Sequence, residues 1–314
     1  MAKNNNLRSA NANKNDEFYT MLTDIEKEMR YYKDFFKGKV VYCNCDDARE
    51  SNFFKYFSLN FEFLGLKKLI TTGYKADGKG VVLVYEGDKN GNRRVDNEEI
   101  IVNELNGDGD FRSEECIEYL KQADVVVTNP PFSLFRQYVK QLMDYNKKFI
   151  IIGNQNAITY KEIFQLIKDN KIWLGLNFVK SFEKPNGDIQ KFGNISWFTN
   201  IENKKRTQPI DLYKRYSFEE YPKYDNFDAI NVDKVADIPM DYDGIMGVPI
   251  TFLNNYCPSQ FTIIGLAADK RDENPLWIKG KETYLDEKHK KFVGMVLNGK
   301  ATYARILIKK IQQG

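Results

Sequence analysis

Short apolar runs alternate with amphipathic segments over the first two thirds of the chain, and this rhythm limits the folds open to it. The apolar runs are rich in Val, Ile and aromatic residues and predict strands; they lie at 39–47, 66–74, 125–127 and 147–158. Apolar residues at helical spacing predict helices around them, at 16–36, 49–65, 113–122, 133–146 and 159–170. Parallel strands need such crossovers, whose helices then cover both faces of the sheet. We therefore predict an α/β fold with a doubly wound, mostly parallel sheet.

Two segments depart from this rhythm. Alternating apolar residues at 76–105, around "DKNGN", predict a β-hairpin inserted between a strand and a helix. Beyond about residue 203 the chain becomes rich in Tyr, Asp, Asn and Pro, with few helical runs. We predict a disordered polar tail at 1–15, a first domain at 16–205 and a smaller region at 206–314.

Composition excludes several classes of protein. A hydrophobic content of 42% and an aromatic content of 14% are those of a folded chain. The sequence has neither an apolar run of membrane-spanning length nor the apolar core of a signal peptide near "MAKNNNLRSANANKND". Four scattered cysteines and one histidine predict no disulfide framework and no metal site. The net charge of +3 is too small to indicate a nucleic-acid binder by itself.

The most informative motif, "TNPPF", follows the predicted strand at 125–127. Ligands bind at the carboxyl ends of strands in open α/β sheets, and this motif stands at such an end. Two prolines fix φ and remove two amide donors, so the corner presents carbonyl acceptors in a rigid geometry. The side chain of Asn129 adds another acceptor. Two converging acceptors suit an amino group, which offers two hydrogens, and Phe132 offers a face on which a base could stack.

These acceptors would address a chemical obstacle. The lone pair of an aromatic amine is delocalised into its ring, which makes the nitrogen a poor nucleophile. Accepting both N–H bonds localises the lone pair, and the interaction strengthens as positive charge develops in the transition state. A simpler interpretation is an X-Pro-Pro turn that ends a strand before a helix.

In these residues the chain resembles the EcoRI-type adenine-specific DNA methyltransferases. "TNPPF" is similar to the signature of enzymes that transfer a methyl group from S-adenosylmethionine to nitrogen. The likeness runs in order through most of the chain, including "DEFYT", "GDGDFRS", "VVTNPPFSLFR", "YPKYDNFDAINV" and "MGVPITFL". It implies a Rossmann-like methyltransferase domain followed by a target-recognition region. It also assigns the catalytic roles to Asn129, Pro130 and Phe132.

The same resemblance implies the cofactor-binding residues. They form three groups: Phe18, Tyr19 and Thr20 around the methionine end, Asn44, Cys45, Asp46 and Asp47 in the first cofactor loop, and Asp110 with Phe111 beside the adenine. The first loop lacks the glycines of most methyltransferases, and which of its two acids touches the cofactor stays open. Asn154, Gln155 and Asn156 are expected to line the pocket. No acid for the cofactor ribose follows the strand at 66–74.

The substrate follows from the same comparison. A base inside a duplex cannot reach such a pocket, so it must be flipped out. Asparagine in the motif favours adenine N6, because cytosine-N4 enzymes usually carry serine there. The resemblance implies site-specific methylation of double-stranded DNA, as part of or derived from a restriction–modification system. A cognate restriction endonuclease is the implied functional partner, without direct contact. We expect a monomer in the cytoplasm of a bacterial or phage-infected cell.

Two other functions fit the motif alone. Methyltransferases acting on RNA or on a protein glutamine also have Asn-Pro-Pro-aromatic loops, but they generally have a glycine-rich first loop, which "CNCDDARESN" lacks. A non-catalytic DNA-binding relative would need no cofactor pocket.

Overall fold

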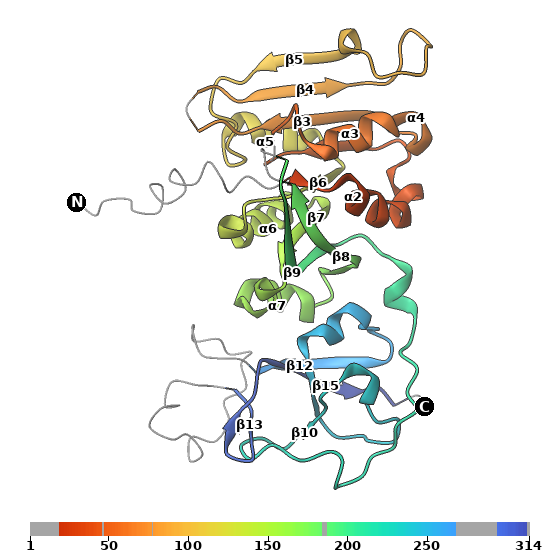
Figure 1. Cartoon of the computed structure of the whole chain (residues 1–314), viewed down its shortest axis with the longest axis vertical. Helices are drawn as coiled ribbons and strands as arrows, with labels where there is room; N and C mark the ends of the chain where they lie inside the picture. Colours follow the sequence, from red (N-terminus) through yellow and green to blue (C-terminus); the bar gives the residue numbers. More distant parts are fainter. Residues whose placement is uncertain (1–18, 46, 77, 184–186, 268–293, 313–314) are drawn as a thin grey trace, which may run out of the picture. The chain divides into compact units, whose positions relative to one another are not determined.

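The computed structural model describes residues 19–45, 47–76, 78–183, 187–267 and 294–312 (Figure 1). The chain divides into two compact units, each described separately below. The first contains residues 1–155 and 175–201, and the second contains 156–174 and 202–314. The first unit ends at residue 201, whereas the sequence predicted a domain boundary at 205. The second unit also includes the segment 156–174, which the sequence placed in the first domain. Among the described residues, no helix has the length and apolar character needed to cross a bilayer.

A nine-stranded sheet forms the first unit. Its strands are β1 (Tyr19–Thr20), β2 (Val40–Cys43), β3 (Lys68–Gly73), β4 (Val81–Tyr85), β5 (Ile100–Glu104), β6 (Val125–Thr128), β7 (Lys148–Asn154), β8 (Trp173–Glu183) and β9 (Ile189–Thr199). Their spatial order is β1-β8-β9-β7-β6-β2-β3-β4-β5. The central neighbours β7, β6, β2 and β3 are parallel, as predicted. Antiparallel strands extend this centre on both sides, through β9 next to β7 and through β4 next to β3.

Helices cover both faces of this sheet, which confirms the predicted doubly wound class. They are α2 (Leu22–Met29), α3 (Asn52–Leu59), α4 (Phe61–Leu64), α5 (Glu114–Gln122) and α6 (Phe135–Asp144). Residues of α2 and α3 share a core with Val41, Val125 and Ile150. On the opposite face, Phe135 of α6 packs edge-on against Phe198 of β9 with ring centroids 5.0 Å apart. Because strand side chains alternate between faces, each central strand is buried on both sides.

Some predicted helix boundaries were wrong. The helix expected at 16–36 begins at Leu22, and the segment Arg30–Phe36 is a 3₁₀ helix. Its expected first turn is partly replaced by β1, which pairs with β8. The helix expected at 49–65 is two helices joined at Asn60, and the second ends at Gly65 with a left-handed φ of 62°. A glycine there avoids the Cβ clash of that conformation.

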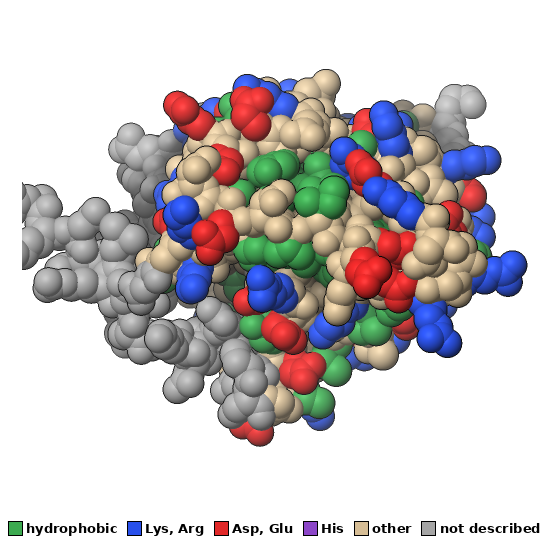
Figure 2. All heavy atoms as spheres, turned by 90° about the horizontal axis from the view of Figure 1, so that it is seen from above, with side chains coloured by type: hydrophobic (Ala, Val, Ile, Leu, Met, Phe, Trp, Pro, Cys, Tyr) green, Lys and Arg blue, Asp and Glu red, His purple; other side chains and the backbone are tan. Residues whose placement is uncertain are grey.

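The hairpin predicted at 76–105 is confirmed. Strands β4 and β5 pair antiparallel and form one edge of the sheet beyond β3 (Figure 1). Strand β5 exposes two apolar residues, Ile101 and Val102, each 47% exposed. Figure 2, which views the molecule from the side of β5, shows hydrophobic side chains interspersed with charged ones.

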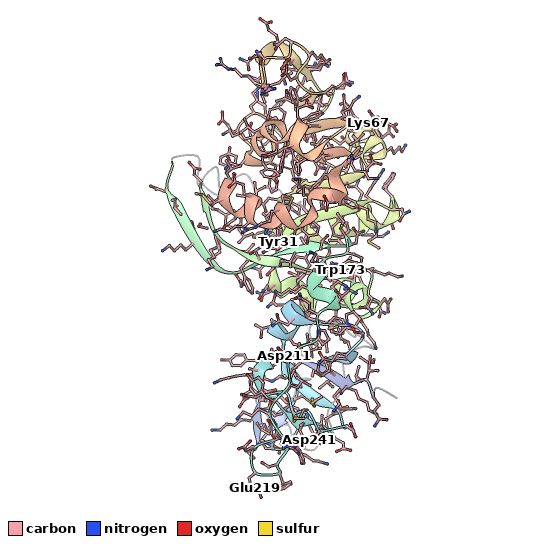
Figure 3. The ribbon with its side chains drawn as sticks, turned by 90° about the vertical axis from the view of Figure 1, so that its right-hand side faces the viewer. Tyr31, Lys67, Trp173, Asp211, Glu219 and Asp241 are labelled. Atoms are coloured by element: carbon pink, nitrogen blue, oxygen red, sulfur yellow. The ribbon has the colours of Figure 1, made fainter. Side chains whose placement is uncertain are left out.

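The second unit contains a smaller sheet in the order β10-β11-β15-β12. Its strands are β10 (Ile230–Asn231), β11 (Met246–Pro249), β12 (Phe261–Ala267) and β15 (Arg305–Lys310), accompanied by the short hairpin of β13 (Val296–Leu297) and β14 (Lys300–Ala301). Helix α7 (Lys161–Lys168) belongs to the same unit, and its Lys168 Nζ donates to the carbonyl of Ile264. Trp173, the first residue of β8, also belongs to this second unit. The guanidinium of Arg206 lies 3.8 Å from its ring centroid; Trp173 is labelled in Figure 3.

A buried carboxylate joins α2 to β8. Glu28 is fully buried, and its oxygens accept hydrogen bonds from the backbone N–H groups of Leu176 at 2.9 Å and Asn177 at 2.8 Å. The hydroxyl of Tyr32 donates to it at 3.1 Å. A Cβ at Gly175 would lie 2.3 Å from Glu28 Oε1, so the carboxylate can approach the strand only over a glycine. Burial raises the pKa of Glu28, although these donors act in the opposite direction.

We expect Glu28→Gln to lower the free energy of unfolding by about 1–3 kcal/mol, because an amide NH₂ would then face a backbone donor. Since burial raises the pKa of Glu28, the folded wild type loses stability as the pH rises above the ordinary carboxyl pKa of 4.5. The glutamine variant lacks this titration. The difference in the free energy of unfolding between wild type and variant should therefore become smaller as the pH rises. Urea unfolding at several pH values measures both effects. Exposed Glu26, on the same helix, provides the control Glu26→Gln. A deficit equal to that of the control would contradict the assignment.

Candidate active site

The candidate site lies where two adjacent parallel strands end. Val41 of β2 is paired with Val125 of β6, so both strands reach the same edge of the sheet. From β2 the chain runs through α3 to β3 on one side, whereas from β6 it runs through α6 to β7 on the other. This divergence makes the β2/β6 edge the topological switch point at which open α/β sheets bind ligands.

The Asn-Pro-Pro-Phe turn leaves β6 at this edge. Asn129 is half-buried with its Oδ1 closed off from solvent, and Pro130 is buried. An amide oxygen shielded from water is a stronger electrostatic acceptor than one in bulk solvent. Phe132 is 36% exposed and begins a short 3₁₀ turn, Phe132–Leu134, that leads into α6. The turn thus combines a shielded acceptor with an accessible aromatic ring.

Asn44, directly after β2, is held by the neighbouring elements. It is 3% exposed. The hydroxyl of Thr128, the last residue of β6, donates to its backbone carbonyl, and the hydroxyl of Tyr138 on α6 donates to its side-chain Oδ1. Burial, and then nearby Cys45 and Tyr42, raise the pKa of Tyr138 well above its ordinary value, so the hydroxyl remains a donor. The ends of β2 and β6 are therefore tied together by side chains from β6 and α6.

The "NGDGDF" loop docks at the end of the next strand, β3. Lys75 N–H donates to the Asp108 carbonyl, and Gly80 N–H donates to the Gly107 carbonyl, each at 2.8 Å. Gly109 has a φ of +83°, and a Cβ there would lie 2.3 Å from the carbonyl oxygen of Gly73. The close approach of two backbones explains why a glycine stands at this position.

Asp110 and Phe111 continue from this loop into the site. Arg112 forms a bidentate ion pair with Asp110, and its Nε donates at 2.8 Å. These hydrogen bonds lower the pKa of Asp110 and keep its carboxyl group ionised. The ring of Phe111 lies edge-on to Tyr138 with centroids 4.9 Å apart, and Gln141 Nε2 donates to the Phe111 carbonyl at 3.1 Å. Helix α6 thus contacts both predicted cofactor loops.

Strand β1 brings Thr20 to the start of α3. Asn52, in the first turn of α3, donates from Nδ2 to the Thr20 carbonyl at 2.8 Å. Thr20 is 1% exposed, and its Oγ1 has no hydrogen-bond partner among the described residues. A buried hydroxyl in this condition has lost its hydration without replacement.

Other predicted residues have different surroundings. Asp47 is exposed, and its Oδ1 accepts from the backbone N–H groups of Arg49 at 2.8 Å and Glu50 at 3.1 Å, as in a local turn. Cys45 is half-buried with a left-handed φ of 68°, and Tyr19 is half-buried in β1. The predictions for Phe18 and Asp46 lie outside the described residues.

The residues expected to line the pocket from β7 contact β9. Asn154 Oδ1 accepts from Asn194 at 3.0 Å, and Gln155 Nε2 donates to Ser196 at 2.7 Å. Asn156, the third residue of that prediction, belongs to the second compact unit.

Sequence reasoning missed three residues that organise this edge of the sheet: Tyr138, Gln141 and Asn52. Tyr138 lies on the apolar stripe of its helix, and a stripe normally indicates core packing. Its hydroxyl is the signal that could have distinguished it, because a buried Tyr O–H usually has a partner. Asn52 and Gln141 carry no comparable signal, since polar side chains on helices are usually solvated.

Comparisons with known proteins agree on one family. The family model for "Adenine-specific methyltransferase EcoRI" matches residues 6–311. The Type II methyltransferase M.EcoRI of Escherichia coli is 47% identical, covering 98% of this chain and 97% of that protein. Two mycoplasma proteins are also similar over 95% of this chain and 96% of their own length: M.MpnI of Mycoplasma pneumoniae at 39% identity and M.MgeORF184P of Mycoplasma genitalium at 37%. The chain therefore belongs to the EcoRI family of adenine-specific methyltransferases and is a DNA methyltransferase that uses S-adenosylmethionine.

Proposed function

We propose that this enzyme methylates N6 of an adenine flipped out of a short site in duplex DNA, with the Asn129 turn as its catalytic corner. The observation that carries the proposal is the junction at the β2/β6 edge, where the turn and the Asn44 loop leave adjacent strands. The side-chain oxygen of Asn129 and the Pro130 carbonyl would each accept one N–H of the adenine amine. Phe132 is accessible enough for the base to stack on it.

These acceptors promote the reaction by favouring the transition state. When N6 forms its bond to carbon, positive charge develops on the nitrogen and its N–H groups become stronger donors. Acceptors in a shielded corner gain from this change, and only interactions that strengthen in the transition state accelerate the chemical step. Transfer would break the methyl–sulfur bond of the cofactor and leave S-adenosylhomocysteine, and one proton would pass from the nitrogen to water as the methylated amine returns to neutrality.

The residues at the site fit S-adenosylmethionine, which supplies an electrophilic methyl group when bound. Thr20 offers a buried hydroxyl without a partner among the described residues, and Asp110 offers an ionised carboxylate. A carboxylate has acceptor positions beyond those taken by one guanidinium, so Asp110 can bind Arg112 and a further donor. We assign cofactor binding to the predicted set: Phe18, Tyr19, Thr20, Asn44, Cys45, Asp46, Asp47, Asp110 and Phe111.

The second unit is proposed to read the DNA sequence. It presents exposed aromatic rings, with Tyr303 90% exposed, Phe218 74% and Tyr213 66%. Exposed cationic side chains, including Lys309 and Arg215, accompany them. Cations suit phosphate contacts, and exposed rings suit contacts with bases and sugars. We further propose that the enzyme acts as a cytoplasmic monomer and protects DNA from a cognate restriction endonuclease that it does not contact.

Product analysis tests this function. Purified enzyme incubated with duplex DNA and methyl-labelled S-adenosylmethionine should place the label in N6-methyldeoxyadenosine after digestion to nucleosides. RNA and a glutamine-rich protein in parallel reactions should remain unlabelled, because the proposed substrate is an adenine flipped out of duplex DNA. Label in methylcytosine, or label only in RNA or protein, would refute the proposal.

A further inference from the structure

Helix α6 contacts two cofactor loops through a single side chain. Tyr138 is fully buried. Its hydroxyl donates to Asn44 Oδ1 after β2, and its ring lies edge-on to Phe111 in the loop after Gly109. The same helix starts three residues after Phe132, so this side chain lies less than two helical turns from the proposed catalytic corner.

The hydroxyl of Tyr138 is not needed to pack α6 against the sheet. Phe135, Val139 and Leu142 are the other buried residues of α6, and they bury the helix against the sheet without polar atoms. A phenol among them would incur a desolvation cost unless its O–H found a partner. That partner is an amide oxygen in the cofactor loop, and the raised pKa of Tyr138 keeps the hydroxyl protonated.

This hydrogen bond fixes which way the Asn44 amide faces. An amide has an acceptor end and a donor end, and Tyr138 holds the acceptor end toward the helix. The NH₂ end is thereby left as the group that Asn44 can offer to a ligand. Without the hydroxyl, the amide could rotate and present either end.

We propose that Tyr138 is a positioning residue for cofactor binding. Its hydroxyl orients the Asn44 amide so that the NH₂ group is left to donate to the cofactor, and its ring holds Phe111 in position. The inference rests on the proposed function and deepens it, because it makes α6 the link between the cofactor loops and the catalytic corner. Tyr138 itself does not touch the reacting atoms in this scheme.

The variant Tyr138→Phe isolates the hydroxyl, because the ring and its contact with Phe111 remain. We expect the dissociation constant for S-adenosylhomocysteine, measured by calorimetry without DNA, to rise about tenfold, the effect of losing one buried hydrogen bond. KM for S-adenosylmethionine should rise by a similar factor, whereas kcat at saturation and KM for DNA should not change. Tyr145→Phe removes a hydroxyl from the C-terminal end of the same helix, at a residue 36% exposed, and should match wild type.

A double-mutant cycle separates positioning from packing. In an Asn44→Ala background, Tyr138→Phe should cause no further loss of affinity, because the hydroxyl then has no amide to orient. Equal losses in both backgrounds, or a lower melting temperature with unchanged affinity for S-adenosylhomocysteine, would overturn the inference. These binding measurements need no methylated product. An enzyme that binds S-adenosylhomocysteine but does not methylate adenine would therefore refute the proposed function and leave the positioning role testable.

Discussion

Replacing Asn129 with alanine is expected to lower kcat for DNA methylation by about 10²–10³-fold, the usual effect of removing one preorganised group that stabilises transition-state charge. The affinity for S-adenosylhomocysteine should remain close to that of wild type, since the cofactor contacts proposed above lie on other loops. Single-turnover rates at saturating DNA measure the first quantity, and calorimetry without DNA measures the second. A lower kcat with unchanged cofactor affinity is expected because the proposed role of Asn129 is to accept an N–H of the target amine.

Asn129→Asp is the informative companion variant. A carboxylate also accepts two hydrogen bonds and has nearly the same shape, so this variant should retain more activity than alanine. The shielded position of Asn129 disfavours a charge, so its activity should stay below that of wild type. If alanine reduces cofactor affinity and kcat by the same factor, Asn129 supports the structure of the edge and has no special role with the amine.

Sequence alone predicted the parallel strands in the centre of the sheet because the signal there is local. The run 149–152 is apolar and rich in isoleucine, and only a strand covered on both faces buries every residue of such a run. The antiparallel flank beyond β7 could not be read in this way. Pairing of β7 with β9 and of β1 with β8 depends on contacts between segments far apart in sequence. For the same reason the helix expected at 16–36 starts late, since pairing with β8 holds Tyr19 and Thr20 extended.

The site shows the same division between local and long-range signals. Asn129 was proposed from its place after a strand, where ligands bind in this fold class, whereas Asn44 and Phe111 were proposed from the resemblance to the methyltransferase family. The linkage of Asn44 and Phe111 through Tyr138 was not predictable, because nothing in an apolar helical stripe indicates which loop a hydroxyl reaches. The partner of Asp110 was equally hidden. Arg112 is two residues away, but only the turn between them brings guanidinium and carboxylate together.

The loop that carries Asp110 and Phe111 gives the second large effect. Gly109→Ala should reduce the affinity for S-adenosylhomocysteine by at least about tenfold and lower the free energy of unfolding by about 2–4 kcal/mol. Two costs combine at this residue. A non-glycine residue at a φ of +83° is strained, and the added Cβ would lie 2.3 Å from the Gly73 carbonyl oxygen. Because the obstructing atom is backbone on a central part of the sheet, the loop must move away from β3.

That movement would displace the residues proposed to bind the cofactor. Phe111 lies two positions further along and is held by Tyr138 and Gln141, so a shift at Gly109 works against both contacts. Gly107→Ala is the matched control, because a Cβ there meets nothing within 4 Å and its φ is not left-handed. Calorimetry should therefore give a lower affinity for S-adenosylhomocysteine for Gly109→Ala than for Gly107→Ala, and urea unfolding should give a lower free energy of unfolding. Two alanine variants with equal affinity and equal stability would show that the contact between this loop and β3 does not organise the cofactor site.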